Sequence, residues 1–264
     1  MKTETPGKKT RPPRAGGLRR HEVLLPPAHT FYVMAESPCP YLPGQLERKL
    51  FTELRPEDAG DFYASLSRGG FRRSHNFAYR PACTGCTACV PVRIDVAGFR
   101  PSRSLRRIAR TNRDLLARER HARATTEQFR VFARYITTRH AEGEMASMAF
   151  GDYRSMIEES VLDTRLVEFR NAAGDLVAGL LTDWSGDGAS AVYSFFDPAL
   201  SERSLGSYMV LWLVEECRRR GLPYVYLGYW IEGSRKMSYK ARFQPLEALG
   251  PSGWQELEPG DATR

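Results

Sequence analysis

The chain has 264 residues, of which 42% are hydrophobic and 11% aromatic, a composition typical of a globular protein with a substantial core. Its formal net charge is +8. No apolar run approaches the roughly 18 residues of a membrane span, and the N-terminus lacks the apolar segment of a secretory signal. These features exclude fibrous and membrane-spanning classes and predict a cytoplasmic protein.

The positive charge is concentrated in two segments, the first of which is the N-terminus. Residues 1–20 contain seven Lys or Arg residues against Glu4 alone. The segment is rich in Pro, Gly and charge and has no apolar period, so we expect residues 1–22 to form a disordered basic tail. A solubilising leader explains this tail as well as a nucleic-acid-binding arm does.

The second basic segment lies between Arg93 and Arg123, where ten arginines accompany three acidic residues. Within residues 102–118, leucine and isoleucine recur at helical spacing, which predicts an amphipathic helix with one buried face. The arginines on the opposite side are Arg103, Arg106, Arg107, Arg110 and Arg113. Because guanidinium groups match phosphates in geometry and charge, we expect this row to bind a nucleic acid, with a solvated face as the alternative.

Local patterns predict the remaining elements in chain order. Pro56 and the apolar residues that follow it indicate a helix over 55–68. The pattern of residues 71–80 indicates a strand or hairpin, and that of residues 90–96 indicates a strand. Thr125 and Gln128 form a capping-box pattern for a helix that ends near Gly143, and a further helix is expected over 152–162. Alternating patterns over 165–170, 176–184 and 189–196 predict an antiparallel meander, followed by a helix over 205–220 and a strand over 224–229.

This order of elements is the layout of the acyl-CoA N-acetyltransferase fold core. We therefore expect an α+β protein with an acetyltransferase-like domain over 125–264 and a smaller, cysteine-containing N-terminal α/β domain with the basic helix over 23–124. In acetyltransferases, the turn before the helix holds the pyrophosphate of coenzyme A on backbone donors. The corresponding turn here, Arg203–Tyr208, has a matching Gly206 but places bulky Tyr208 where a small residue belongs, which suggests a different acyl carrier, an aminoacyl-tRNA.

Four cysteines form a candidate metal site. Cys83, Cys86 and Cys89 follow a Cys-x-x-Cys-x-x-Cys pattern, and Cys39 lies on a proline-stiffened loop that could supply a fourth thiolate. Four soft ligands suit zinc or an iron–sulfur cluster, and the pattern does not choose between them. The alternative is a loop packed by thiols without a metal.

Several blocks together resemble the arginyl-tRNA–protein transferase family, and most closely its bacterial aspartate/glutamate leucyltransferase branch. The blocks are Pro38–Leu42, Gly70–Ser74, Tyr79–Pro91, Ser102–Ser104, Phe195–Pro198, Ser204–Gly206, Tyr226–Tyr229 and Lys236–Lys240. The resemblance implies transfer of leucine from Leu-tRNA to the N-terminus of proteins that begin with Asp or Glu, which marks them for N-degron degradation. It also implies that no cofactor is required for transfer, although family members carry zinc or iron–sulfur ligation at comparable cysteines.

An acidic acceptor side chain requires cationic donors in a shaped pocket. The candidates for this pocket are Arg72, Arg73, Tyr135, Lys240 and Arg242. For the catalytic carboxylate that orients the attacking amine, the candidates are Asp183 and Asp197, at the ends of meander strands, and His140 is a weaker candidate for the base. Phe195 and Trp184 are candidates for the leucyl pocket.

Other functions stay open at this point. Arginyl transfer from Arg-tRNA would use the same mechanism, and a coenzyme A-dependent N-acetyltransferase would use the Arg203–Tyr208 turn. A non-catalytic RNA-binding module would use the basic helix alone, and an iron–sulfur redox protein would use the cysteines. The sequence gives no indication of membrane binding.

Overall fold

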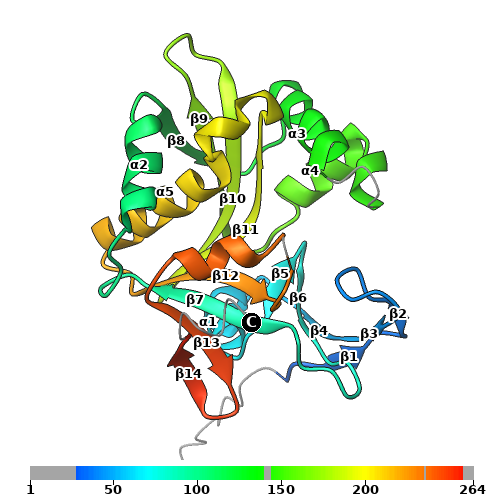
Figure 1. Cartoon of the computed structure of the whole chain (residues 1–264). Helices are drawn as coiled ribbons and strands as arrows, with labels where there is room; N and C mark the ends of the chain where they lie inside the picture. Colours follow the sequence, from blue (N-terminus) through cyan, green and yellow to red (C-terminus); the bar gives the residue numbers. More distant parts are fainter. Residues whose placement is uncertain (1–27, 140–143, 235, 258–264) are drawn as a thin grey trace, which may run out of the picture.

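A computed structural model describes residues 28–139, 144–234 and 236–257 (Figure 1). The basic tail predicted at 1–22, His140 and Gly143 lie outside these ranges. The strands are β1 Phe31–Val33, β2 Ser37–Pro38, β3 Leu46–Glu47, β4 Lys49–Glu53, β5 Arg72–Ser74, β6 Phe77–Pro81, β7 Val90–Asp95, β8 Leu116–His121, β9 Asp163–Arg170, β10 Leu176–Ser185, β11 Gly188–Phe196, β12 Tyr224–Trp230, β13 Leu246–Gly250 and β14 Gly253–Glu256. The helices are α1 Ala59–Arg68, α2 Arg103–Thr111, α3 Thr126–Arg139, α4 Phe150–Glu158 and α5 Leu205–Arg219, with 3-10 turns η1 Glu144–Ser147, η2 Pro198–Arg203 and η3 Ser238–Arg242.

The main sheet has eight strands in the order β14-β13-β7-β12-β11-β10-β9-β8. Strands β9, β10 and β11 form the predicted antiparallel meander. After α5 the chain returns as β12, which pairs in parallel with β11. This confirms the α+β class and the acetyltransferase-like order of strands, helix and strand.

Helices cover both faces of this sheet. In Figure 1, α2 and α5 lie on one face of the meander, and α3 and α4 lie on the other. Phe169, Leu180 and Leu213 belong to the core under α2 and α5, and Phe132 and Phe195 belong to the core under α3 and α4. Both faces of the central strands are therefore buried, which explains why β10 is apolar along most of its length.

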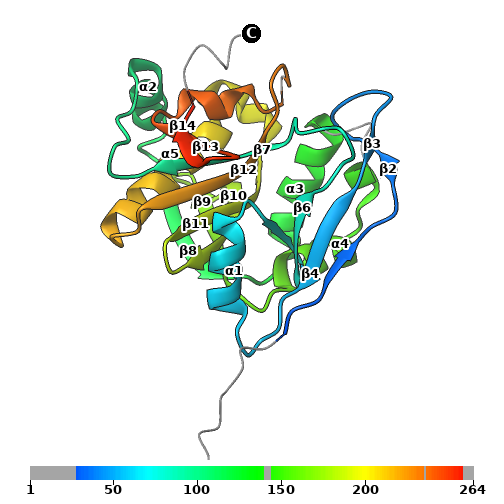
Figure 2. The same cartoon turned by 90° about the horizontal axis from the view of Figure 1, so that it is seen from below.

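A second sheet holds the N-terminal strands in the order β1-β4-β6-β5 (Figure 2). Its two faces differ, because α1 packs on one of them through Tyr63 and Leu66, around Ala78. Strands β7 and β8 fall within the N-terminal range expected from the sequence, 23–124, but they are members of the main sheet. The main core therefore extends across residue 124.

The basic helix is shorter than predicted. Helix α2 begins after Ser102, whose hydroxyl accepts a hydrogen bond from the backbone of Leu105, and it ends at Thr111 instead of residue 118. The side chain of Asn112 caps the end by donating to the Ile108 carbonyl at 2.9 Å. The chain then enters β8, where Leu116 is 51% exposed, so Leu115 alone of the two adjacent leucines is buried.

The capping box predicted at Thr125 is confirmed. The Gln128 backbone donates to the Thr125 hydroxyl at 3.2 Å, and the Gln128 side chain accepts from the Thr125 backbone at 2.8 Å. Within the described part of the chain, no helix combines the length and apolarity needed to cross a membrane.

Candidate active site

The two central strands of the main sheet part from each other. Strands β11 and β12 are paired only over Gly188–Ser190 and Tyr224–Tyr226. Beyond this stretch, β11 and β12 each carry one unpaired residue. This residue is Val192 in the pairing of β11 with β10 and Leu227 in the pairing of β12 with β7. The parting leaves backbone carbonyls on both strands without a strand partner, and such groups require another donor.

Arg72 supplies that donor from the second sheet. Its Nη1 donates to the Leu227 carbonyl at 3.0 Å, and its Nη2 donates to the Ala191 and Val192 carbonyls at 2.9 and 3.1 Å. The guanidinium therefore joins β11 to β12 where they part. These contacts use three of its five N–H groups, and Arg72 forms no ion pair with any residue that the structure describes.

Gly228 makes room for this contact. It has a φ of +77°, and a Cβ built on it would lie 1.3 Å from Arg72 Nη1. Only glycine allows both the left-handed backbone and the close approach of the guanidinium. Sequence analysis missed this residue as part of the site, although a glycine inside the strand Tyr-Leu-Gly-Tyr is a known signal of close backbone approach.

A cavity of about 560 Å³ lies at the parting of the strands. Its walls come from the β5–β6 hairpin, β11, β12, the first turns of α5, and the segment that leads into η3. Its cations are Arg72, Arg73, Lys236 and Lys240, and its lining, as described, contains no Asp or Glu. A further part of the wall is apolar, with Met145, Met156, Leu180, Met209 and Val210.

Lys240 is buried in the cavity wall, with 6% of its surface exposed. Its Nζ donates to the Tyr229 carbonyl at 2.5 Å, and it has no carboxylate partner among the described residues. Burial, and secondarily the charge of Arg72, lower the pKa of Lys240 to about 7. This lysine is therefore neutral in a large fraction of molecules near pH 7, unlike an exposed lysine.

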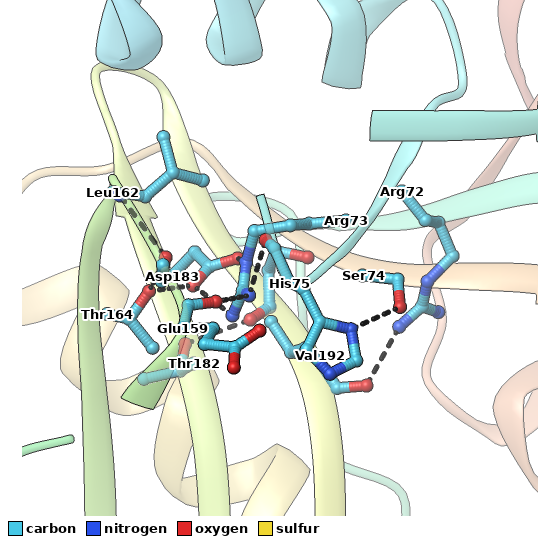
Figure 3. A network of polar contacts seen from close by, with 12 residues as sticks. Arg72, Arg73, Ser74, His75, Glu159, Leu162, Thr164, Thr182, Asp183 and Val192 are labelled. Carbon is cyan, nitrogen blue, oxygen red and sulfur yellow. Dashed lines mark hydrogen bonds and ion pairs between the residues drawn. The ribbon is translucent and has the colours of Figure 1, made fainter. Parts of the chain in front are cut away.

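Arg73, the neighbour of Arg72, points to the other side of β5 (Figure 3). It forms a buried ion pair with Asp183, through Nε to Oδ2 at 2.6 Å and Nη2 to Oδ1 at 2.9 Å. Asp183 also accepts from the Thr164 hydroxyl at 2.6 Å, and Arg73 donates to the carbonyl of His75, a residue with a φ of +52°. This network attaches the β5–β6 hairpin to β9 and β10.

The structure brings neither predicted catalytic carboxylate to the cavity wall. Asp183 is fully buried and has no exposed surface. Asp197 caps η2 by accepting from the Ala199 backbone at 3.1 Å, and it pairs with Arg134 at 3.0 Å. Both carboxylates make structural contacts here and lie outside the cavity lining.

The residues predicted for acceptor recognition divide into two sets. Arg72, Tyr135 and Lys240 line the cavity together, and burial raises the pKa of Tyr135, so its hydroxyl stays neutral. Arg73 also reaches the wall, although Asp183 neutralises it. Arg242 lies outside the lining and donates to the Ser104 hydroxyl on α2 at 3.3 Å.

The leucyl-pocket candidates Phe195 and Trp184 also lie outside the lining. Phe195 belongs to the core between the sheet and α3. The ring of Trp184 stacks against Arg220, whose guanidinium carbon lies 3.7 Å from the ring centre. The apolar wall of the cavity comes instead from methionines on η1, α4 and α5, Leu180 on β10 and Val210 on α5, which carry no distinguishing sequence pattern.

The five arginines of the predicted nucleic-acid row are all exposed. Arg103, Arg106, Arg107 and Arg110 lie on α2, whose Leu105 and Ile108 face the core, and Arg113 follows the helix. Through Ser104, α2 contacts Arg242, which is two residues from Lys240. The basic surface and the cavity are therefore connected by the short segment η3.

Two side chains of the turn that would hold coenzyme A make contacts within the protein. Arg203 donates to the Asn112 side chain at 3.0 Å and pairs with Asp114, which lowers the pKa of that carboxyl. Tyr208 packs edge-on against Phe169. The side chain of Arg203 therefore binds residues at the C-terminal end of α2.

The four cysteines of the candidate metal site are all free and partly exposed. Burial, and after it the neighbouring thiols Cys39, Cys83 and Cys86, raise the pKa of Cys89 to about 11. The thiols are therefore close enough to influence one another. As placed, no group of three or more His, Cys, Asp or Glu side chains in the described ranges has the arrangement of a metal site, and a zinc or iron–sulfur site at these cysteines stays a prediction.

Replacement of Gly228 by alanine tests the contact with Arg72. Gly228→Ala forces the guanidinium out of the gap and should lower the free energy of unfolding by more than about 2 kcal/mol, measured by urea denaturation. Gly221→Ala is the matched control, because Gly221 has a similar φ of +68° and open space around its Cβ. It should cost about 1 kcal/mol, and equal losses in the two variants would contradict the contact.

Comparison with known proteins identifies the family. Residues 37–107 match the family described as arginine-tRNA-protein transferase, N terminus, and residues 127–250 match arginine-tRNA-protein transferase, C terminus. The chain is 59% identical to the aspartate/glutamate leucyltransferase of Paramagnetospirillum magneticum, over 88% of this chain and 96% of that protein. It is 55% identical to the protein of the same name from Rhodospirillum rubrum, over 86% of this chain and 92% of that protein.

A solved structure with partial likeness is the crystal structure of FemX, which has a TM-score of 0.43 and 10% identity over 72% of this chain and 65% of that one. The two family matches cover both the hairpin that carries Arg72 and the strands that it joins. The chain belongs to the arginine-tRNA-protein transferase family.

Proposed function

We propose that the protein transfers leucine from Leu-tRNA to the N-terminus of proteins that begin with Asp or Glu, and thereby marks them for degradation in the cytoplasm. The names of its relatives support this activity. The observation that carries it is Arg72, a cation in a cavity without acidic lining, whose contacts are to backbone carbonyls alone. A carboxylate from the acceptor would complement its charge.

The donor tRNA would bind along the exposed arginines of α2 and Arg242. Phosphate contacts of this kind fix position and do not read sequence. Since Arg242 is two residues from Lys240, an aminoacyl end that leaves this surface would enter the cavity beside the lysine. The leucyl side chain would then occupy the apolar wall around Leu180 and Met209.

Apolar walls beside the Arg72 cation favour leucine over arginine as the transferred residue. A donor arginine would bring a second positive charge close to Arg72, and like charges at short range repel strongly away from water. Coenzyme A is also disfavoured as donor, because Arg203 is bound to Asn112 and Asp114.

The chemistry requires a neutral amine and a proton acceptor. The nitrogen of the acceptor's α-amine attacks the ester carbonyl carbon, a C–N bond forms, and the bond from that carbon to the ribose oxygen breaks. We assign the proton acceptor to Lys240, which accepts a proton from the amine and returns it to the leaving ribose oxygen. Holding the two substrates together supplies the rest of the acceleration, and the transfer needs no cofactor.

The acceptor preference tests the assignment of Arg72. Wild-type protein should leucylate an Asp-starting peptide at least about 100-fold faster, in kcat/KM, than the same peptide starting with Asn, because the amide leaves a buried charge unpaired. Arg72→Gln keeps an amide donor for the carbonyls but removes the charge, so this ratio should fall about tenfold or more.

Arg242→Ala is the control for that experiment. It should raise the KM for Leu-tRNA and leave the Asp-to-Asn ratio unchanged, because Arg242 lies outside the cavity. Urea denaturation of each variant separates loss of folding from loss of recognition. An unchanged Asp-to-Asn ratio in a folded Arg72→Gln protein would contradict the assignment.

The pH dependence of stability tests the state of Lys240. Its pKa is about 7 when folded, against 10.5 for an unperturbed lysine, so the unfolded chain binds the extra proton between these values. As the pH falls from 9 to 7, wild-type protein should lose about 1.4 kcal/mol of stability per pH unit relative to Lys240→Met, and the difference should level off below 7. A constant difference from pH 9 to 7, measured by urea denaturation, would show that the lysine stays charged in the fold.

A further inference from the structure

A row of aromatic side chains leads away from Arg72 across the second sheet. In the strand register, Arg72 lies opposite Tyr79, Tyr79 opposite Phe51, and Phe51 opposite Tyr32. Directly opposed residues share one face of a sheet, so the row crosses all four strands from β5 to β1. It begins at the cation that we propose for acceptor recognition.

The face that carries this row is apolar and open. Tyr32 is 53%, Met34 49% and Phe77 42% exposed, although large apolar side chains are usually buried. Tyr32 stacks on Phe51, and Phe51 contacts Phe77 edge-on. On the opposite face of the sheet, α1 packs around Ala78.

A hollow of about 460 Å³ lies on this face and adjoins the active-site cavity. Its lining includes Met34, Phe51 and Phe77, and it shares Ser74, His75 and Tyr79 with the cavity. The β5–β6 hairpin therefore contributes lining residues to both spaces. A peptide whose first residue lies in the cavity could extend over this hairpin to the hollow.

The charges of the hollow do not suit a nucleic acid. Lys49, its cation, pairs with Glu47 at 2.6 Å, and Glu159 is also part of the lining. A phosphate backbone requires an excess of Lys or Arg, which α2 provides elsewhere. An extended polypeptide with apolar side chains matches the hollow better.

We propose that this aromatic face binds residues two to five of the acceptor protein and favours acceptors with apolar side chains there. The inference rests on the proposed function, which places the acceptor's first residue at Arg72. Neighbouring strands lie about 4.8 Å apart, and an extended chain advances about 3.3 Å per residue. Phe51, two strands from Arg72, is then within reach of residue three or four, and Tyr32 within reach of residue five.

The test compares two peptides that begin with Asp and differ at positions two to five, Leu-Phe-Leu-Phe against Ser-Gly-Ser-Gly. Leucyl transfer gives kcat/KM for each, and fluorescence anisotropy of labelled peptides gives Kd in the absence of tRNA. Wild-type protein should favour the apolar peptide about tenfold in both measurements. In Tyr32→Ser/Phe77→Ser, both ratios should fall below about twofold.

Val33→Ser/Leu116→Ser is the matched control. Val33 is 57% exposed next to Tyr32 but points to the opposite face, and Leu116 is 51% exposed on β8. This variant should keep the tenfold preference. Equal preference in the two double variants, or no preference in wild-type protein, would overturn the inference.

Two other occupants of the aromatic face would give different results, and either result would overturn the inference. A second copy on the face would appear in sedimentation as a wild-type dimer that Tyr32→Ser/Phe77→Ser converts to a monomer. Binding of tRNA would appear as a raised KM for Leu-tRNA in that variant, with the peptide ratio unchanged. Failure of the proposed function can be distinguished from failure of this inference. Leucyl transfer to every peptide would then be absent, while anisotropy would still measure peptide binding to the aromatic face.

Discussion

The contact of Arg72 with the parted strands β11 and β12 determines the rest of the site. Where two parallel strands separate inside a sheet, their backbone carbonyls lose hydrogen-bond partners and a cavity opens between them. A guanidinium can donate to several of these carbonyls at once, because its N–H groups form a rigid fork. Three carbonyls on the two strands accept from Arg72. The same contact brings a positive charge into the cavity and leaves it without a carboxylate among the described residues, so in the proposed function the group that stabilises the opening would also recognise an anionic substrate.

Two adjacent arginines on β5 have opposite roles because side chains alternate along a strand. Arg73 points into the protein, where Asp183 neutralises it and anchors the hairpin. A buried pair of this kind fixes geometry more than it adds stability. With the hairpin held in this way, Arg72 points toward the gap, and the uncompensated charge there contributes to the lowered pKa of Lys240. In the proposed reaction, the one cation Arg72 would therefore influence both acceptor recognition and proton transfer.

Much of the fold was predictable from local patterns. The meander and the capping box at Thr125 follow from alternation and spacing, and the grouping of Arg72 with Lys240 follows from the family resemblance of the blocks that contain them. The parting of β11 and β12 was not predictable, because it depends on register irregularities and on the approach of Arg72 to Gly228. The ion pair of the catalytic candidate Asp183 with Arg73 was not predictable either, because the two residues are 110 positions apart in the sequence. Helix α2 ended early because Asn112 caps it through contacts with Ile108 and Arg203.

If Arg72 recognises the acceptor, the side-chain carboxylate of the acceptor binds the remaining N–H groups of Arg72 in the gap between the strands. A crystal structure with a bound Asp-starting peptide would show this contact. We expect a carboxylate oxygen within about 3.2 Å of an Arg72 nitrogen, with the carbonyl contacts to β11 and β12 kept. A carboxylate bound instead to Lys236 or Arg242, with Arg72 contacting backbone alone, would contradict it.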